Sequence, residues 1–126
     1  MYKRFALLCL VVTLLAGIAL AGAVKIDLMP YPVGNPIEPD ASGKAVLNYA
    51  EKGDGKTEVQ VNCWGLVGEA EYTVYITDAS GVYVPLCTFT TNKIGSGSCH
   101  GKIDGDLTGS TVAVNNSSNL TVLLGP

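Results

Sequence analysis

The strongest constraint on the fold is a two-residue alternation that continues through the chain from Lys44 onward. Short runs rich in Val, Tyr, Thr and Leu alternate apolar with polar residues, and helical periodicity is absent. Turn-forming stretches such as Gly53-Asp54-Gly55 separate the runs. The pattern predicts seven strands, over residues 44–50, 57–64, 71–77, 83–91, 97–103, 110–115 and 119–124. Strands this short and this evenly spaced indicate an all-β domain built as a two-sheet sandwich.

The same alternation assigns side chains to the two faces of each strand, because successive side chains point to opposite sides. Three rows are predicted to face the core: Val59, Val61 and Cys63; Tyr72, Val74 and Ile76; and Leu120, Val122 and Leu124.

The N-terminus has the residue order of a secretory signal. Lys3 and Arg4 precede an apolar run that ends in Ala21-Gly22-Ala23, which matches an A-x-A cleavage site. We expect residues 1–23 to be a signal peptide that is cleaved before Val24. The apolar run is long enough that an uncleaved membrane anchor is the alternative.

Two further segments follow the predicted signal. Residues 24–43 contain Pro30, Pro32, Pro36 and Pro39, which fix φ and remove backbone donors, so we expect an extended proline-rich arm there. Residues 44–126 form the predicted β-sandwich domain. About a hundred residues after cleavage are a common size for a single hydrophobic core.

The distribution of charge argues against nucleic acid as a partner. The only arginine in the chain is Arg4, inside the signal, and acidic residues outnumber basic ones by 11 to 8. Phosphate binding needs a basic stripe, which this sequence does not supply. We expect contact with a membrane only if the signal segment is retained.

One stretch resembles a known class of module. In "GLVGEAEYTVYI", residues 65–76, Leu66 precedes Tyr72 by six residues before an alternating strand. This spacing is similar to the tyrosine corner of immunoglobulin-like and fibronectin type III modules, although Gly68 stands where such modules usually have proline. The resemblance implies an immunoglobulin-like sandwich in which the Tyr72 hydroxyl bonds to backbone near the turn.

A second stretch tests for a metal site. The run "TFTTNKIGSGSCHG" is similar to hairpins of secreted superoxide-dismutase-like sandwiches, which hold copper with several histidines. His100 is the only histidine here, so no such metal site is expected. Asp78 with Asp104-Gly105-Asp106 supplies oxygen ligands that suit calcium, but ordinary turn chemistry is the preferred explanation. We expect no metal and no cofactor.

The cysteines are expected to be structural. Cys87 lies two residues before Phe89 on the inward face, Cys99 is also inward, and His100 points to the opposite, polar side. Disulfides are the default use of cysteines in a secreted domain. A Cys87–Cys99 bridge across a hairpin is therefore predicted, which leaves Cys63 as a buried free thiol or as a link to a second chain. Pairing of Cys63 with Cys87 or with Cys99 stays open.

Two groups of surface residues are candidates for contacts outside the chain. Trp64, Tyr75 and Tyr83 fall at outward positions or near turns and form a candidate binding surface. Asn115, Asn116 and Asn119 each begin an N-x-S/T triplet, which makes them candidate glycosylation sites.

These features favour a non-catalytic protein. The primary hypothesis is a secreted or cell-surface module for adhesion, binding or surface display, whose partner is a protein or a glycan at the cell surface. The alternative is a self-assembling structural subunit of an extracellular sheath or surface layer, linked to its own copies through strand edges or an intermolecular disulfide.

Overall fold

All seven predicted strands form, and one further strand precedes them. The computed structural model describes residues 23–50 and 52–126. These residues form an all-β fold of eight antiparallel strands: β1 (Ala23–Pro30), β2 (Ser42–Tyr49), β3 (Lys56–Trp64), β4 (Glu71–Thr77), β5 (Tyr83–Thr90), β6 (Gly97–Asp104), β7 (Val112–Asn115) and β8 (Thr121–Gly125). The predicted bounds differ from those of β2 to β8 by at most two residues.

Alternation correctly assigns the faces of the two strands on which it is most regular. Along β3 every second side chain is buried, including Val59, Val61 and Cys63, while the residues between them are exposed. Along β4 the buried side chains are Tyr72, Val74 and Ile76, as predicted. These rows meet in one hydrophobic core.

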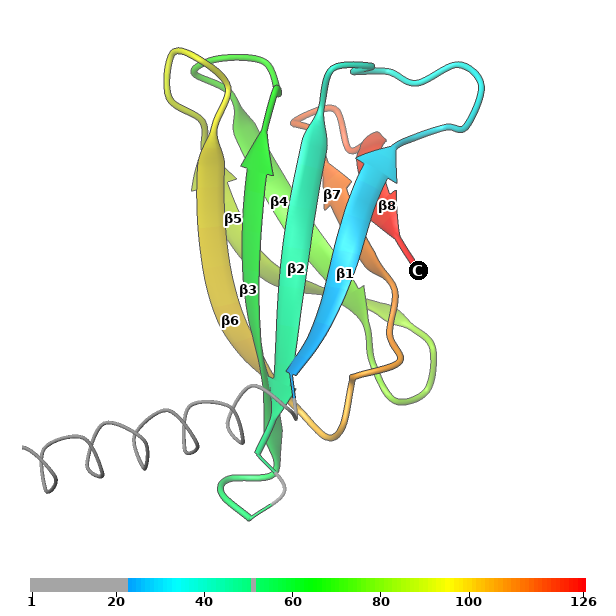
Figure 1. Ribbon diagram of the computed structural model, residues 1–126, viewed down its shortest axis with the longest axis vertical. Coiled ribbons are helices and arrows are strands. Elements are labelled where there is room, and N and C mark those ends of the chain that lie inside the picture. Colours follow the sequence, from blue (N-terminus) through cyan, green and yellow to red (C-terminus); the bar gives the residue numbers. More distant parts are fainter. Residues whose placement is uncertain (1–22, 51) are drawn as a thin grey trace, which may run out of the picture.

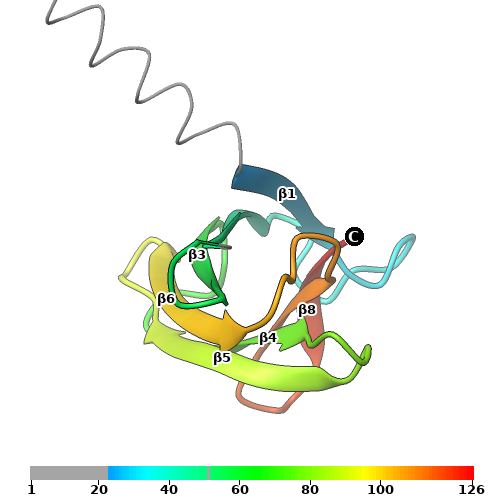
Figure 2. The same cartoon turned by 90° about the horizontal axis from the view of Figure 1, so that it is seen from below.

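The strands form one nearly closed, barrel-like sheet in the order β5-β4-β7-β8-β1-β2-β3-β6. Figure 1 shows β6, β3, β2 and β1 side by side in front of β5, β4, β7 and β8. From below, the strands surround a common interior, and β5 lies next to β6 (Figure 2). The all-β class is therefore confirmed, whereas a two-sheet immunoglobulin-like sandwich is not. In the immunoglobulin order the second strand pairs with the first and the fifth, but β2 pairs with β1 and β3.

The segment expected to be an extended arm instead begins with a core strand. β1 pairs with β2 through residues 23–28 and with β8 through Met29 and Pro30. Ile26 and Leu28 are buried, whereas Asp27 between them and Lys25 and Met29 on either side are exposed. The prolines begin only where the alternation ends, so they shape the loop at residues 31–41 and not the strand. The predicted signal peptide lies outside the described residues apart from Ala23, the first residue of β1.

The two ends of the sheet, β5 and β6, are joined by side chains. Within the described residues β5 pairs only with β4 and β6 only with β3, so the predicted cysteine hairpin does not form. The Cys87–Cys99 disulfide nevertheless connects the two strands, with a Cα–Cα distance of 6.0 Å. Phe89 lies against Gly97, where any Cβ would collide with its ring. Glycine on β6 therefore lets β5 approach closely enough for the disulfide to close the sheet.

Of the inward row predicted for the last strand, Val122 is confirmed, but Leu120 and Leu124 are wrong because the strand contains an irregularity. Val114 pairs with Leu123 but Asn115 pairs with Thr121, so the register between β7 and β8 shifts by one residue. Val122 and Leu123 are consequently both buried. Leu124 moves to the outer face, and Leu120 is 50% exposed.

The tyrosine corner forms as the resemblance implied, with one unexpected partner. The Val67 N–H donates to the Tyr72 hydroxyl over 3.1 Å, and that hydroxyl donates to Glu38 Oε1 over 2.8 Å. Glu38 also accepts from the Val67 N–H at 3.1 Å. Burial, together with the hydrogen bond to Glu38, raises the pKa of Tyr72 to about 12. Glu38 thus fastens the loop at residues 31–41 to the core.

Gly68 has a steric reason to replace the proline of similar corners. A Cβ at this position would collide with the carbonyl oxygen of Lys93 in the β5–β6 connection. The β3–β4 connection is held to the β5–β6 connection by the buried Thr91, whose hydroxyl donates to the Val67 carbonyl over 2.6 Å.

Candidate functional site: a tyrosine-lined groove

A groove crosses the outer face of the layer that contains β4, β5, β7 and β8. Its volume is about 400 Å³, which lies within the range of small-molecule sites, roughly 300–1,000 Å³. Its walls combine aromatic rings with amide and hydroxyl groups. The lining residues are Tyr31, Tyr75, Tyr83, Ala113, Asn115, Asn119, Thr121 and Leu124.

The register of the sheet builds the centre of this groove. Tyr75 points outward from β4, between the buried Val74 and Ile76. It is opposite Ala113 of β7, which is in turn opposite Leu124 of β8. Because the Ala113 side chain is small, it leaves open space beside the Tyr75 ring.

The other two tyrosines come from the start of β5 and the end of β1. Tyr83 is opposite Thr77, and Thr77 lies two residues beyond Tyr75 on the same face of β4. The Tyr83 side chain is 49% exposed. Tyr31 follows β1 and is 38% exposed. Its N–H donates to the Val122 carbonyl over 3.0 Å, which extends the pairing of β1 with β8. Three separate elements therefore place a tyrosine at one groove.

A row of hydrogen-bonded side chains forms the polar part of the wall. The Thr121 hydroxyl donates to Asn115 Oδ1 over 2.8 Å, and Asn115 Nδ2 donates to Asn119 Oδ1 over 3.1 Å. Asn119 has a φ of 61° in the β7–β8 turn. Asn116 Oδ1 accepts from the Leu120 N–H at 3.0 Å and so caps this turn. The row is fixed in place, and the second N–H of Asn115 and the Asn119 amide nitrogen make no hydrogen bond within residues 23–50 and 52–126.

None of the eight lining residues is an acid, a lysine, an arginine or a histidine. The groove therefore presents aromatic faces and uncharged donors and acceptors to a ligand.

The three aromatic residues predicted as one binding surface occupy two places. Tyr75 and Tyr83 lie together in the groove, whereas Trp64 is 42% exposed and borders a separate hollow beside Ser96 and Ser98. Tyr31 was not among the predicted surface residues, because it lies within residues 24–43, which were expected to form an arm. An aromatic residue directly after an alternating strand was the available signal.

The candidate glycosylation sites also separate. Asn115 and Asn119 line the groove, while the Asn116 side chain is engaged in capping the turn. The asparagines that begin two of the triplets are thus also wall residues of the candidate site.

Cys63 is a free thiol in the core and is only 2% exposed. Burial raises its pKa to about 12, so the reactive thiolate is suppressed near neutral pH. The pairings of Cys63 with Cys87 or Cys99 do not form, because those two cysteines are bonded to each other. A link to another chain would require the core to open.

The residues considered for metal binding do not gather into one site. His100 is exposed and opposite Gln60, away from the inward-facing disulfide. Asp78 accepts from the Ser80 hydroxyl over 2.6 Å and from the Val82 and Ser80 N–H groups in its own turn, and these bonds, that of the hydroxyl first, lower its pKa. Among the described residues, no group of three or more His, Cys, Asp or Glu side chains is placed to share a metal ion.

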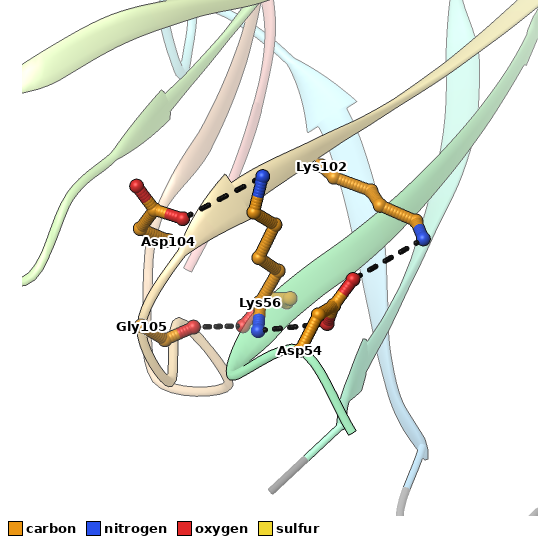
Figure 3. A network of polar contacts seen from close by, with 6 residues as sticks. Asp54, Lys56, Lys102, Asp104 and Gly105 are labelled. Atoms are coloured by element: carbon orange, nitrogen blue, oxygen red, sulfur yellow. Dashed lines mark hydrogen bonds and ion pairs between the residues drawn. The ribbon is translucent and has the colours of Figure 1, made fainter.

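The remaining carboxylates near β3 and β6 face lysines. Figure 3 shows Asp54 opposite Lys102 and Asp104 opposite Lys56, with N–O distances of 3.5 and 3.8 Å. These pairs are exposed and contribute little to stability. They join the turn before β3 to the end of β6.

No helix in the described part of the chain is both long enough and apolar enough to cross a membrane. No protein-family model matches this sequence, and neither a curated protein nor a solved structure matches it.

Proposed function

We propose that this chain is a non-catalytic extracellular module that binds its partner through the groove lined by Tyr31, Tyr75 and Tyr83. The observation that carries the proposal is the convergence of these tyrosines from three elements on one uncharged surface. Aromatic side chains supply large, rigid contact areas, and tyrosine adds a polar tip that suits a partly wet site.

Secretion is part of the proposal and rests on independent observations. The charged start, apolar run and Ala21-Gly22-Ala23 motif support a signal peptide. The Cys87–Cys99 disulfide is compatible with an oxidising compartment. Mass spectrometry of secreted material should find a mature chain that begins at Val24; an intact Met1 in a membrane fraction would instead establish an anchor.

A finer proposal is that the fold serves as a display scaffold that shares the tyrosine corner of immunoglobulin-like modules, although its strand order differs from theirs. The Leu66–Tyr72 corner supports it, since its backbone bond to the tyrosine hydroxyl is present. In such a scaffold a stable core supports variable surfaces, so the function resides in the groove and not in the fold itself.

The test is binding of the purified, secreted protein to the surface of the cells that produce it, measured by flow cytometry. Tyr75→Ala and Tyr83→Ala should each weaken binding at least tenfold, because each removes an aromatic wall. Trp64→Ala is the matched control, since it removes a similarly exposed aromatic residue outside the groove, and it should bind like the wild type. Equal binding by all four proteins, or no binding by the wild type, would refute the proposal.

The alternative, a self-assembling subunit, has one specific observation in its favour. β5 and β6 are the two ends of the sheet, and each pairs on one side only. A neighbour's strand could add there only if the two strands moved apart. Sizing of the wild type and of the Cys87→Ser, Cys99→Ser variant distinguishes the cases: concentration-dependent oligomers favour assembly, and a monomer throughout favours the binding module.

A further inference from the structure

We infer that the tyrosine-lined groove takes a neutral saccharide chain. This inference rests on the proposed binding function and adds the chemical class of the ligand. It follows from the charge of the groove, from its mixture of aromatic and amide groups, and from its size.

The absence of cationic side chains from the wall selects against an anionic ligand. An anionic group buried against this surface would lose hydration without gaining an ion pair, because none of the eight lining residues carries a positive charge. Phosphates and carboxylates are therefore poorly suited to the site.

The two kinds of wall match the two faces of a sugar ring. A pyranose has an apolar C–H face and a rim of hydroxyl groups. The rings of Tyr75 and Tyr83 provide flat apolar surface for the C–H face. The Asn115, Asn119 and Thr121 row provides amide donors and amide and hydroxyl acceptors for the hydroxyl rim.

The hydrogen-bonding groups of that row also favour a saccharide over a proline-rich peptide, the other kind of ligand that binds aromatic grooves. A polyproline segment offers only carbonyl acceptors, so it can pair with the amide donors of the row but not with its acceptors. Sugar hydroxyls both donate and accept and can satisfy both. The internal bonds of the row, at 2.8 and 3.1 Å, hold it in place before a ligand arrives, which limits the entropy lost on binding.

The dimensions of the groove fit part of a chain. Its volume of about 400 Å³ is at the small end of ligand sites. The lining residues extend from Tyr83 on β5, across β4, β7 and β8, to Tyr31 beyond β1. This path lies across the strands and can follow a linear oligosaccharide.

The experiment uses the full chain, expressed in a host that exports proteins without N-glycosylation, so that the disulfide forms and Asn115 and Asn119 stay unmodified. The probes are the neutral hexaoses of β-1,4-glucose, β-1,4-N-acetylglucosamine, β-1,4-xylose and β-1,4-mannose. A hyaluronan hexasaccharide and a proline decamer serve as the charged and peptide comparisons. Saturation-transfer NMR detects contact, and calorimetry gives Kd.

We expect at least one neutral hexaose to bind, with Kd raised at least tenfold by Tyr75→Ala and by Tyr83→Ala and unchanged by Trp64→Ala. Binding of none of the neutral hexaoses, binding that ignores both groove substitutions, or groove-dependent binding of the proline decamer or hyaluronan in their place would overturn the inference.

A second arm separates this inference from the proposed function. Periodate cleaves the 2,3-diols of β-1,4-linked glucose, xylose and mannose, and chitinase hydrolyses β-1,4-linked N-acetylglucosamine, so treating the cells with both should abolish groove-dependent binding of the protein. If that binding survives both treatments and is instead lost on protease treatment, the saccharide inference fails while the binding function stands. If Tyr75→Ala and Tyr83→Ala bind untreated cells as well as the wild type does, both fail.

Discussion

Among single residues, Tyr72 and Glu38 connect a long loop to the core. The Tyr72 ring stacks on Phe89 with 5.7 Å between centroids, and its hydroxyl links the corner to Glu38. Tyr72→Phe keeps the ring but removes both hydroxyl bonds, so it should lower the free energy of unfolding by about 1–3 kcal/mol. Denaturant melts measure this directly. Glu58→Gln, on the exposed face of β3, is the control and should stay within about 0.5 kcal/mol. Unchanged midpoint and slope for Tyr72→Phe would remove the corner from the account of stability.

Two buried acids, Cys63 and Tyr72, should make stability fall at alkaline pH. Their ordinary pKa values of 9.0 and 10.0 rise to about 12 in the folded protein. Each protonated group therefore contributes stability that is fully present below the pKa it has in the unfolded chain. That stability is lost as pH rises toward the higher pKa that the group has in the folded protein. Once pH exceeds the unfolded pKa, each contributes a loss of about 1.4 kcal/mol per pH unit.

Urea melts between pH 7 and 11 test this alkaline dependence. The wild type should begin to weaken above about pH 9 and more steeply above about pH 10, whereas Cys63→Ala should show only the later decline, owed to Tyr72. This variant also removes the thiolate that would attack the disulfide at high pH. A free energy of unfolding that stays level to pH 11 in both proteins would contradict the burial of these groups.

Among the elements, the contact between β5 and β6 depends on glycine. Gly97→Ala places a Cβ into the Phe89 ring, and this overpacking should cost about 1–3 kcal/mol. Gly109→Ala is the matched control, because nothing lies within 4 Å of a Cβ at that position; it should be neutral or slightly stabilising. Thermal melts compare the two. Similar melting temperatures for both variants would show that β5 and β6 can separate without cost.

The strands themselves were largely predictable, because alternation is a local property. β2 to β8 follow from it, as do the buried rows of β3 and β4. Two errors have local causes of a different kind. The prolines from Pro30, the last residue of β1, onward concealed a strand whose inward residues, Ile26 and Leu28, alternate correctly. The irregularity opposite Asn115 reversed the faces of Leu123 and Leu124, and such an extra residue leaves no trace in hydrophobic pattern alone.

For the whole molecule, the candidate site was only partly predictable. Tyr75 and Tyr83 were identified as outward aromatics, and the asparagines as triplets, but nothing in the sequence joined them. Their proximity depends on β4 pairing with β7, two strands that are adjacent in the sheet but are separated in the chain by β5 and β6. Local alternation determines which face a residue occupies; long-range strand order determines its neighbours.

The whole sheet depends on β1, because it is the strand at which the two layers meet. Its first part pairs with β2, its last two residues pair with β8, and Leu28 is 1% exposed beneath both. Leu28→Ala should therefore lower the free energy of unfolding by about 2–5 kcal/mol, the range for emptying a packed core site.

Asp27→Ala, on the outer face of the same strand, should change the free energy of unfolding by no more than about 0.5 kcal/mol. Denaturant melts of the secreted proteins distinguish the two. If this segment were a detached arm, neither substitution would alter the melt, so equal stability of the two variants would place β1 outside the core. If only Leu28→Ala lowers the free energy of unfolding, β1 belongs to the core. A chain truncated beyond Val24 would then lose residues of the strand that joins the two layers.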